Sequence, residues 1–587
     1  MSASRKDRLR VELENSPGEV MSAKQAISRY LPISSWLPES SPRTDILAGI
    51  ALAGLLVPEG MAYAGIAGLP PQMGLYAAMA GMFVYALFGT SRQLAVTSTS
   101  SSAAMLAALV APLALGNSAR YAVLASAATI GAGIIFLLAG VFKMGSVSEF
   151  ISKPVLKGFV FGLALTIMVK QVHKLMGIPG GHGNFFYQAW HVVKFLTHLN
   201  PWTCAVAAVA ILTMFLLGVI APRVPSALVV LVLGILSASL FGLQAHGVEM
   251  VGTIQAGMPS ATLPRVVGAD AANLFIGTFG IVLVLMAEAL SAGRTFAAKH
   301  KYEINPNQEL CAMGAANVAS GLVGGMIVGG GMSGTAANDA GGARTQLSTI
   351  TASLSVALTL GFLLPLMRNV PEAVLGAIVI HAVAHLADVG TLKRYAKLGS
   401  WSLWSALVAL SGVLLLGILR GLIFAVALTL VVVMRKLSVP ADSVLGRLPG
   451  SEHFVDVERN REAEQIPGLL IFRPNGILFF ANANRVHKHL RELLKHTSPP
   501  LRAVVLDLES CPETDVTSLE MLDQLHNELH DAGIDLYLAR VADPVRDLLD
   551  RGGFLERLGP GRVFPGIGIA AAACQEAMQA PVPARGA

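Results

Sequence analysis

The feature that most constrains the fold is a series of apolar runs between residues 45 and 437, each about as long as a membrane-spanning helix. A helix needs roughly 20 apolar residues to cross a bilayer. Charged residues make up 14% of the chain, whereas a soluble domain usually carries about 25%. The sequence therefore predicts a polytopic α-helical membrane protein.

With roughly 20 apolar residues needed for each crossing, the apolar runs predict about fourteen spans. The clear ones lie near 45–68, 72–89, 119–142, 155–176, 203–221, 226–244, 271–292, 347–367, 371–388, 402–419 and 420–437. The shorter or interrupted ones are 94–115, 308–324 and 326–343. An even number places both termini on one side, and the Lys and Arg of alternate loops predict that this side is the cytoplasm. The predicted location is the inner (plasma) membrane.

The distribution of charge divides the chain into five parts. We predict a cytoplasmic N-terminal segment (1–44), a membrane domain (45–437), a linker (438–465), a small α/β domain (466–575) and a disordered tail (576–587). Within the α/β domain, residues 469–482 are predicted to form two short strands around a Pro-Asn-Gly turn. The later strands alternate with amphipathic helices, which is typical of an α/β fold.

One stretch inside the membrane domain, Gly324 to Gln346, cannot be an ordinary helix. Glycine costs about 1 kcal/mol per residue in a helix, so its glycine run predicts a break. Broken backbone survives in a bilayer only where protein or a water-filled cavity satisfies it. A half-helix starting near Ser333 would offer free N–H groups and a positive dipole end to an anion. Close helix packing through glycine is the alternative explanation.

The two halves of the membrane domain resemble each other weakly. Segment 52–64 is similar to 281–293, with Glu59 aligned on Glu288, and the same spacing carries the Ser/Thr-rich run 94–103 onto the glycine run 323–332. Paired interruptions at matching places are typical of transporter binding sites. Seven spans in each half would make the repeats inverted.

Several ordered motifs resemble the SulP, or solute carrier 26, family of anion transporters. They are VPEGMAYAGIAGLPPQMGLY (57–76), FGTSR (88–92), INPNQELCAMGAANVASGL (304–322) and NDAGGARTQL (338–347). The C-terminal part resembles the STAS domain of the same family. This resemblance implies 7+7 inverted repeats divided into a transport core and a gate, a homodimer, and elevator-like movement of the core.

The resemblance also implies a substrate site between the starts of the third and tenth spans, lined by the first. Matching positions are Tyr63 in the first span, Thr97, Ser98, Thr99 and Ser100 at the third, and Gly331, Met332, Ser333, Gly334 and Thr335 at the tenth. Hydroxyl and N–H donors facing two helix starts would bind a small anion. Hydrogen bonding between helices is the alternative role for the hydroxyl run.

Two carboxyl groups are candidates for ion coupling. Many relatives carry an arginine where this chain has Gly334, and the loss of that cation suggests that a co-transported cation balances the charge. Glu59 lies inside a span, where a carboxylate is costly and by default functional, and it could carry a proton unless a lysine or helix N–H groups neutralise it. Glu288 could bind a cation, possibly sodium, or pair with Arg294. The coupling ion is therefore predicted to be H⁺, with Na⁺ as the alternative.

The sequence lacks the signals of other classes. Its four cysteines have no C-x-x-C spacing, so neither a disulfide framework nor a thiolate metal site is expected, and no cofactor or nucleic-acid partner is predicted. The expected function is proton-coupled symport of a small inorganic or carboxylate anion (sulfate, bicarbonate or a dicarboxylate). The alternatives are a sodium-coupled symporter or an anion exchanger, a nucleobase transporter of the same architecture, and a membrane-anchored STAS signalling protein. An enzyme is not expected.

Overall fold

The computed structural model describes residues 41–146, 152–181, 183–221, 224–252, 263–264, 269–384, 386–439, 442–496 and 500–579. The chain divides into two compact units, one up to Thr429 and the other from Leu430. The predicted segment 1–44 lies outside the described residues except for its last four positions, and the predicted tail does so from residue 580 onward.

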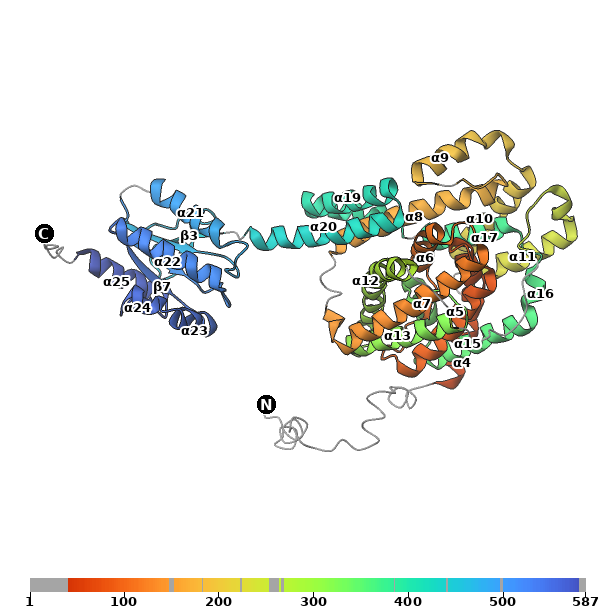
Figure 1. Cartoon of the computed structure of the whole chain (residues 1–587), viewed down its shortest axis with the longest axis horizontal. Helices are drawn as coiled ribbons and strands as arrows, with labels where there is room; N and C mark the ends of the chain where they lie inside the picture. Colours follow the sequence, from red (N-terminus) through yellow and green to blue (C-terminus); the bar gives the residue numbers. More distant parts are fainter. Residues whose placement is uncertain are drawn as a thin grey trace, which may run out of the picture. The chain divides into compact units, whose positions relative to one another are not determined.

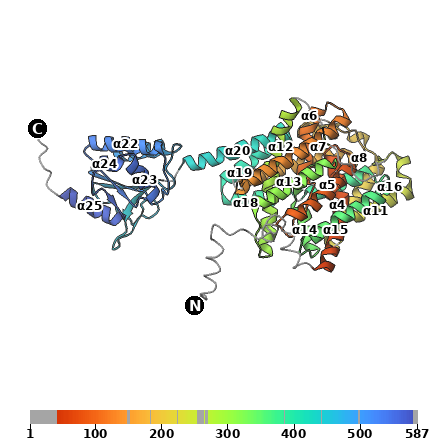
Figure 2. The ribbon, with the colours of Figure 1, turned by 60° about the horizontal axis from the view of Figure 1, so that its bottom comes forward.

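The first unit is helical (Figures 1 and 2). Along the sequence its elements form two successive halves. The first half comprises α4 (Pro42–Ile66), α5 (Pro71–Phe88), β1 (Val96–Thr97), α6 (Ser100–Ala114), α7 (Ser118–Val141), α8 (Lys153–Met176), α9 (Phe185–Lys194), α10 (Pro201–Ile220) and α11 (Ser226–Phe241). The second comprises α12 (Ala269–Lys299), α13 (Pro306–Leu322), β2 (Gly329–Gly330), α14 (Met332–Ala340), α15 (Leu347–Leu358), a π-helical turn (Thr359–Leu363), α16 (Leu364–Met367), α17 (Glu372–Ala384), α18 (Val389–Leu398), α19 (Ser400–Leu416) and α20 (Ile418–Ser438).

These helices confirm the polytopic prediction. Among the described residues, 9 helical segments are long and apolar enough to cross a membrane, and α6, α11 and α19 are shorter apolar helices. With α13 and the half-helix α14, each half contributes seven segments, and an odd number inverts the second half relative to the first. A short amphipathic helix follows the fifth segment of each half, α9 in the first and α18 in the second, which repeats the same order of elements.

The helices pack as two groups. In one, α13 lies against α7 and α5, and α4 and α5 lie against α15. In the other, α8 lies against α17 and α19, and α10 lies against α11 and α17. Small residues permit the closest contact: a Cβ added to Gly133 would meet the carbonyl oxygen of Gly314 at 2.7 Å, and one added to Gly314 would meet that of Gly133 at 2.8 Å. Such close backbone approach is typical of helix packing in membranes.

The second unit is an α/β domain around a sheet of 6 strands in the order β4-β3-β5-β6-β7-β8. Strands β5 to β8 are parallel, whereas β3 pairs antiparallel with both β4 and β5. The strands are β3 (Ser443–Arg447), β4 (Phe454–Asp456), β5 (Leu469–Arg473), β6 (Ala503–Asp507), β7 (Asp535–Ala539) and β8 (Val563–Phe564). The helices are α21 (Ala483–His496), α22 (Val516–Asp531), α23 (Asp543–Arg551), α24 (Phe554–Leu558) and α25 (Ile567–Gln579). Successive residues of β5 and β6 belong alternately to two separate apolar cores, one on each face of the sheet.

The elements of this unit differ from the sequence predictions at three places. The predicted linker 438–465 contains β3 and β4, because Val444 and Leu445 pair with β5 and belong to the sheet. The predicted hairpin over 469–482 contains one strand only. After the turn at Gly476, Leu478 makes an isolated parallel bridge to Thr514 instead of returning along β5. The predicted domain boundary at 575 also falls within α25.

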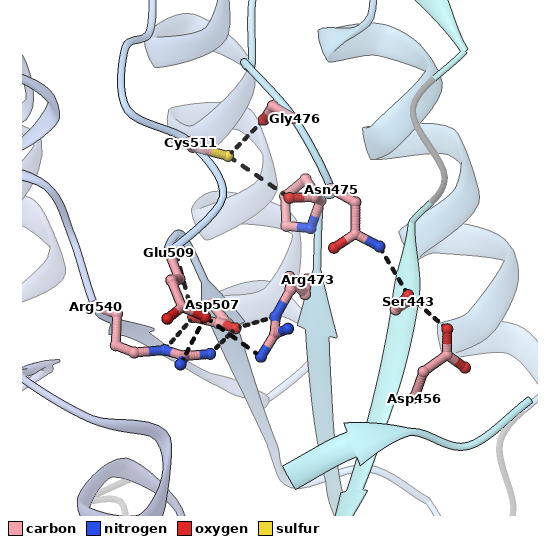
Figure 3. A network of polar contacts seen from close by, with 10 residues as sticks. Ser443, Asp456, Arg473, Asn475, Gly476, Asp507, Glu509, Cys511 and Arg540 are labelled. Carbon is pink, nitrogen blue, oxygen red and sulfur yellow. Dashed lines mark hydrogen bonds and ion pairs between the residues drawn. The ribbon is translucent and has the colours of Figure 1, made fainter. Parts of the chain in front are cut away.

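A network of charged side chains lies at the carboxyl ends of the parallel strands β5, β6 and β7 (Figure 3). The fully buried Asp507 at the end of β6 accepts hydrogen bonds of 2.5 Å from Arg473 Nε and from Arg540 Nη2. Arg540 also pairs with Glu509 at 2.7 Å. A buried carboxylate is tolerated when it is paired and hydrogen-bonded in this way.

Candidate functional site

The candidate site begins at the break between α13 and α14. Here β2 pairs antiparallel with β1, with Val96 opposite Gly330 and Thr97 opposite Gly329. Each of these two-residue strands leads directly into a helix, α6 or α14. The pairing therefore brings the N-termini of two half-helices, one from each half of the unit, to the same place.

Side chains satisfy the backbone of the break. Asn317 on α13 donates to the carbonyl oxygen of Val328 and accepts from its N–H, both at 3.0 Å. On the other strand, Gln346 donates to the carbonyl oxygen of Leu94 at 2.9 Å. Non-helical backbone at membrane depth needs such partners. These contacts make the predicted interruption a defined structural element.

The two half-helices begin differently. Thr99 caps α6 through a reciprocal pair of hydrogen bonds with Ser102, of 3.1 and 3.0 Å. Gly331 precedes α14 and has no side chain to cap it. A Cβ at Gly331 would lie 3.1 Å from the Thr99 methyl group, so glycine allows the two starts to approach. The free N–H groups and the dipoles of both helices favour a negative charge between them.

A cavity of about 250 Å³ opens at this point. The predicted residues Glu59, Tyr63, Thr97, Ser98, Thr99, Ser100, Glu288, Gly331, Met332, Ser333 and Gly334 all line it. A slightly larger cavity of about 310 Å³ between α10 and α11 is lined almost wholly by apolar side chains. The cavity at the half-helices is therefore the better candidate for a charged ligand.

The hydroxyl group of Ser98 is buried at the cavity without a hydrogen-bond partner among the described residues. Ser98 is 1% exposed, and its Oγ has no hydrogen-bond partner within the described part of the chain. Buried polar atoms nearly always have a partner. Because Ser98 lies immediately before α6 and lines the cavity, a ligand oxygen there would supply the missing partner.

The carboxyl groups of Glu59 and Glu288 line the same cavity. Glu59 on α4 is 6% exposed and is hydrogen-bonded by the hydroxyl of Tyr63, one turn later. Glu288 on α12 accepts a hydrogen bond of 2.9 Å from Ser101 Oγ, which lies 3.0 Å from Thr99 Oγ1. Glu288 therefore faces the hydroxyl-rich start of α6, an environment of oxygen ligands that suits a proton or a hard cation.

The structure departs from the predicted site at two positions. Thr335 does not line the cavity: it is fully buried, donates to the carbonyl oxygen of Gly331 at 2.7 Å and accepts from the N–H of Ala95 at 3.2 Å. Its side chain joins α14 to β1. The lining also contains a cation that is absent from the predicted site, Lys157 on α8, which interacts electrostatically with Glu288.

Sequence reasoning missed three polar lining residues, Ser101, Lys157 and Ser291. Ser101 continues the Ser/Thr run and could have been included on that ground. Lys157 stands near the start of a span, where the sequence pattern is typical of a loop cation. Only the packing of α8 across the cavity reveals its place.

Taken together, the inverted halves, the paired broken helices and the carboxyl-lined cavity are typical of membrane transporters with a central binding site. The chain matches the sulfate permease family over residues 43–409 and the STAS domain over residues 460–570. It therefore belongs to the sulfate permease family, which consists of transporters and not of enzymes.

Individual relatives agree with this assignment. The chain is 36% identical over 524 residues to a probable sulfate transporter of Mycobacterium tuberculosis (strain CDC 1551 / Oshkosh), covering 89% of this chain and 93% of the relative. It is 28% identical over 554 residues to high affinity sulfate transporter 2 of Stylosanthes hamata, covering 89% of this chain and 82% of that one.

The fold is shared with solved transporter structures. The murine solute carrier 26 family member A9 anion transporter, in its inward-facing state, superposes with a TM-score of 0.86 at 22% identity, covering 98% of this chain and 99% of that chain. The transmembrane domain of the cyanobacterial bicarbonate transporter BicA gives a TM-score of 0.58 at 24% identity, covering 65% of this chain and 97% of the other.

Proposed function

We propose that this protein is a secondary-active symporter that carries a small oxyanion, such as sulfate, bicarbonate or a dicarboxylate, together with a proton. The observation that carries the proposal is the cavity in which two helix N-termini, the unpartnered Ser98 hydroxyl and the carboxyl groups of Glu59 and Glu288 meet. The sulfate and bicarbonate transporters among its relatives support the choice of anions.

The hydrogen-bond donors of this cavity bind the anion, and its carboxyl groups bind the proton. Main-chain N–H groups at the start of α14 and the hydroxyls of Ser98 and Ser100 bind the anion oxygens. A carboxylate would repel the same anion, so binding favours the state in which the carboxyl group of Glu59 carries a proton. The bound anion and the proton therefore stabilise each other in the site, which is the basis of symport.

Glu288 provides the second coupling position. Its contact with Ser101 ties α12 of the second half to α6 of the first. A proton held on Glu288, or a sodium ion held by its carboxylate and the hydroxyls of Ser101 and Thr99, would remove the negative charge from this wall. The proposed ion is H⁺, and Na⁺ is the alternative outcome of the test.

Movement of the anion requires one group of helices to slide past the other. We propose an elevator motion in which α6 and α14 travel with α4, α5, α7, α12, α13 and α15 along a scaffold that contains α8 and α17. The apolar residues Leu156 and Val160 on α8 and Ala382 on α17 face the site across the cavity. These apolar side chains cannot form hydrogen bonds with the anion, so they do not hold it back as the site moves past them.

The proposed setting is the plasma membrane, with both termini in the cytoplasm and two copies forming a homodimer. Lys and Arg at the ends of successive spans support this orientation. Attachment of a single fluorescent or cysteine label after residue 579, with impermeant quencher added outside, tests it. Cross-linking of the purified protein in membranes tests the dimer.

An uptake panel in proteoliposomes tests the function itself. Sulfate, bicarbonate, succinate and uracil are each supplied with an inward proton gradient, with an inward sodium gradient, or with neither. The proposal expects accumulation of an anion driven by the proton gradient and no uptake of uracil. Uptake of uracil alone, or anion flux indifferent to both gradients, contradicts the proposal.

A further inference from the structure

A second polar cavity of about 250 Å³ lies near the C-terminal end of α8. Its polar lining comes from Lys170, Gln171, His173 and Lys174 on α8 and from Gln188 on α9. No carboxyl group of the described residues lines it. The cavity is therefore basic, unlike the carboxyl-lined candidate site.

Both cavities lie along the same boundary between helices. On α4, Tyr63 lines the candidate site and Gly65 lines the basic cavity, and on α6 the corresponding residues are Ser101 and Ala104. On α8, Lys157 and Lys170 are separated by about 20 Å at a rise of 1.5 Å per residue. The two cavities therefore follow one another along the boundary that α8 forms with α4 and α6.

Apolar side chains separate the two cavities. Leu163 and Ala164 on α8 are both fully buried between the positions that line the candidate site and those that line the basic cavity. These two side chains offer no hydrogen bond to an anion between the two cavities.

The charges of the basic cavity are not all compensated. Lys174 Nζ pairs with Glu372 on α17 at 2.9 Å, and Glu249 acts electrostatically on His173. Lys170, by contrast, has no ion-pair or hydrogen-bond partner among the described residues, although its side chain is partly buried within a span. An ionisable residue inside a span marks an ion pathway by default.

Two glycines lie close to basic groups of the cavity. A Cβ added to Gly65 would lie 3.8 Å from Lys174 Nζ, and one added to Gly180 would lie 3.3 Å from His173 Nε2. Gln188 is held in place by donating to the carbonyl oxygen of Gly183 at 2.8 Å. The Gln188 side chain is thus positioned by the backbone of the segment that precedes α9.

We propose that this basic cavity is a second anion-binding position, which captures the transported oxyanion near the C-terminal end of α8, away from the candidate site. Lys170 supplies the charge that attracts and holds the anion, and His173 and Gln171 supply further donors. In the orientation proposed above, this cavity faces the outside of the cell. The inference rests on the proposed anion transport.

The test measures the apparent KM from each side, with radiolabelled sulfate as the first probe and otherwise the anion that the wild-type protein carries in the uptake panel. Uptake into right-side-out membrane vesicles reports the outer side, and uptake into inverted vesicles reports the inner side. Lys170→Gln is expected to raise the outer KM about fivefold or more and to leave the inner KM unchanged. Lys170→Arg keeps the charge and is expected to retain the wild-type value.

Lys194→Gln is the matched control, because Lys194 is exposed on α9 and does not line the cavity. As a second measurement, a His173→Cys variant is treated from outside with an impermeant thiol reagent. The probe anion is expected to slow this labelling. An outer KM that is unchanged in Lys170→Gln, a KM that rises equally on both sides, or labelling that the anion does not slow would overturn the inference. Absence of any anion uptake by the wild-type protein would instead refute the proposed function.

Discussion

Ser101 donates a hydrogen bond of 2.9 Å to the carboxylate of Glu288 and so links the third membrane segment to the eighth. The two residues come from opposite halves of the transporter, and each lies beside the cavity at the half-helices. This contact means that protonation or cation binding at Glu288 acts directly on the start of α6, where the anion is proposed to bind.

Glu59→Gln is expected to abolish uptake driven by a proton gradient, because glutamine fills the same volume but cannot take up or release a proton. Binding of the anion itself should persist, since glutamine carries no negative charge. Uptake in proteoliposomes and anion-induced thermal stabilisation measure the two effects. Glu303→Gln, in an exposed loop, is the control, and wild-type pH-driven uptake by Glu59→Gln would exclude this carboxyl from coupling.

Ser101→Ala is expected to change the apparent affinity for the coupling ion by about tenfold, because a hydrogen bond to a charged group contributes roughly 1.5–3 kcal/mol. The change appears in the dependence of uptake rate on pH, or on sodium concentration if sodium is the coupling ion. Glu288→Gln should remove that dependence altogether. If both variants keep the wild-type dependence, Glu288 has no part in ion coupling.

Lys157→Gln is expected to raise the KM for the anion roughly fivefold, because its charge lies at the cavity but is largely exposed to solvent. The effect should shrink as ionic strength rises, since salt screens exposed charges over about 10 Å at 0.1 M. Lys153→Gln, one turn earlier and also exposed, should leave KM unchanged. Equal effects of the two substitutions would assign Lys157 a general surface role only.

Asn317→Leu is expected to destabilise the protein by about 2–4 kcal/mol, because it leaves the buried N–H and carbonyl of Val328 without partners. The measurement is thermal unfolding in detergent, read together with uptake. Asn460→Leu, which removes an exposed amide in the second unit, should have little effect. A wild-type melting temperature for Asn317→Leu would show that the break does not depend on this bridge.

Cys511 is expected to resist alkylation at pH 8 in the native protein. Burial, reinforced by the charges of Asp507 and Asp442, raises the pKa of its thiol to about 12, so only about one molecule in 10⁴ carries the reactive thiolate at that pH. Reaction should speed up about tenfold per pH unit below pH 12. Mass spectrometry after brief iodoacetamide treatment measures it, with denatured protein as the reference, and rapid native labelling at pH 8 would contradict the burial of this side chain.

The apolar runs, the glycine break and the Ser/Thr run were enough to predict the membrane fold and the place of the two half-helices. These features are local: a run of apolar residues can satisfy its backbone only as a helix in the bilayer, and a glycine cluster interrupts that helix wherever it occurs. Ser333 could therefore be assigned to a helix start from the glycine run itself, whereas Ser98 was assigned through the family resemblance. Both residues line the cavity.

The strands β3 and β4 and the true role of Thr335 depended on contacts between distant parts of the chain. Ser443 to Arg447 carries no strong strand pattern, and it becomes a strand only because it pairs with β5. Thr335 looks like its neighbours at a helix start, yet its hydroxyl is engaged by Ala95 from the other half of the unit.

The sequence alone thus determined which segments enter the membrane, where two of them break and that carboxyl groups lie within them, because hydrophobicity and backbone preference act over neighbouring residues. The tertiary structure alone decided which side chains share a cavity. It placed Lys157 across from Glu288 and joined Ser101 to it, because such approaches depend on how whole helices pack and not on any pattern within one of them.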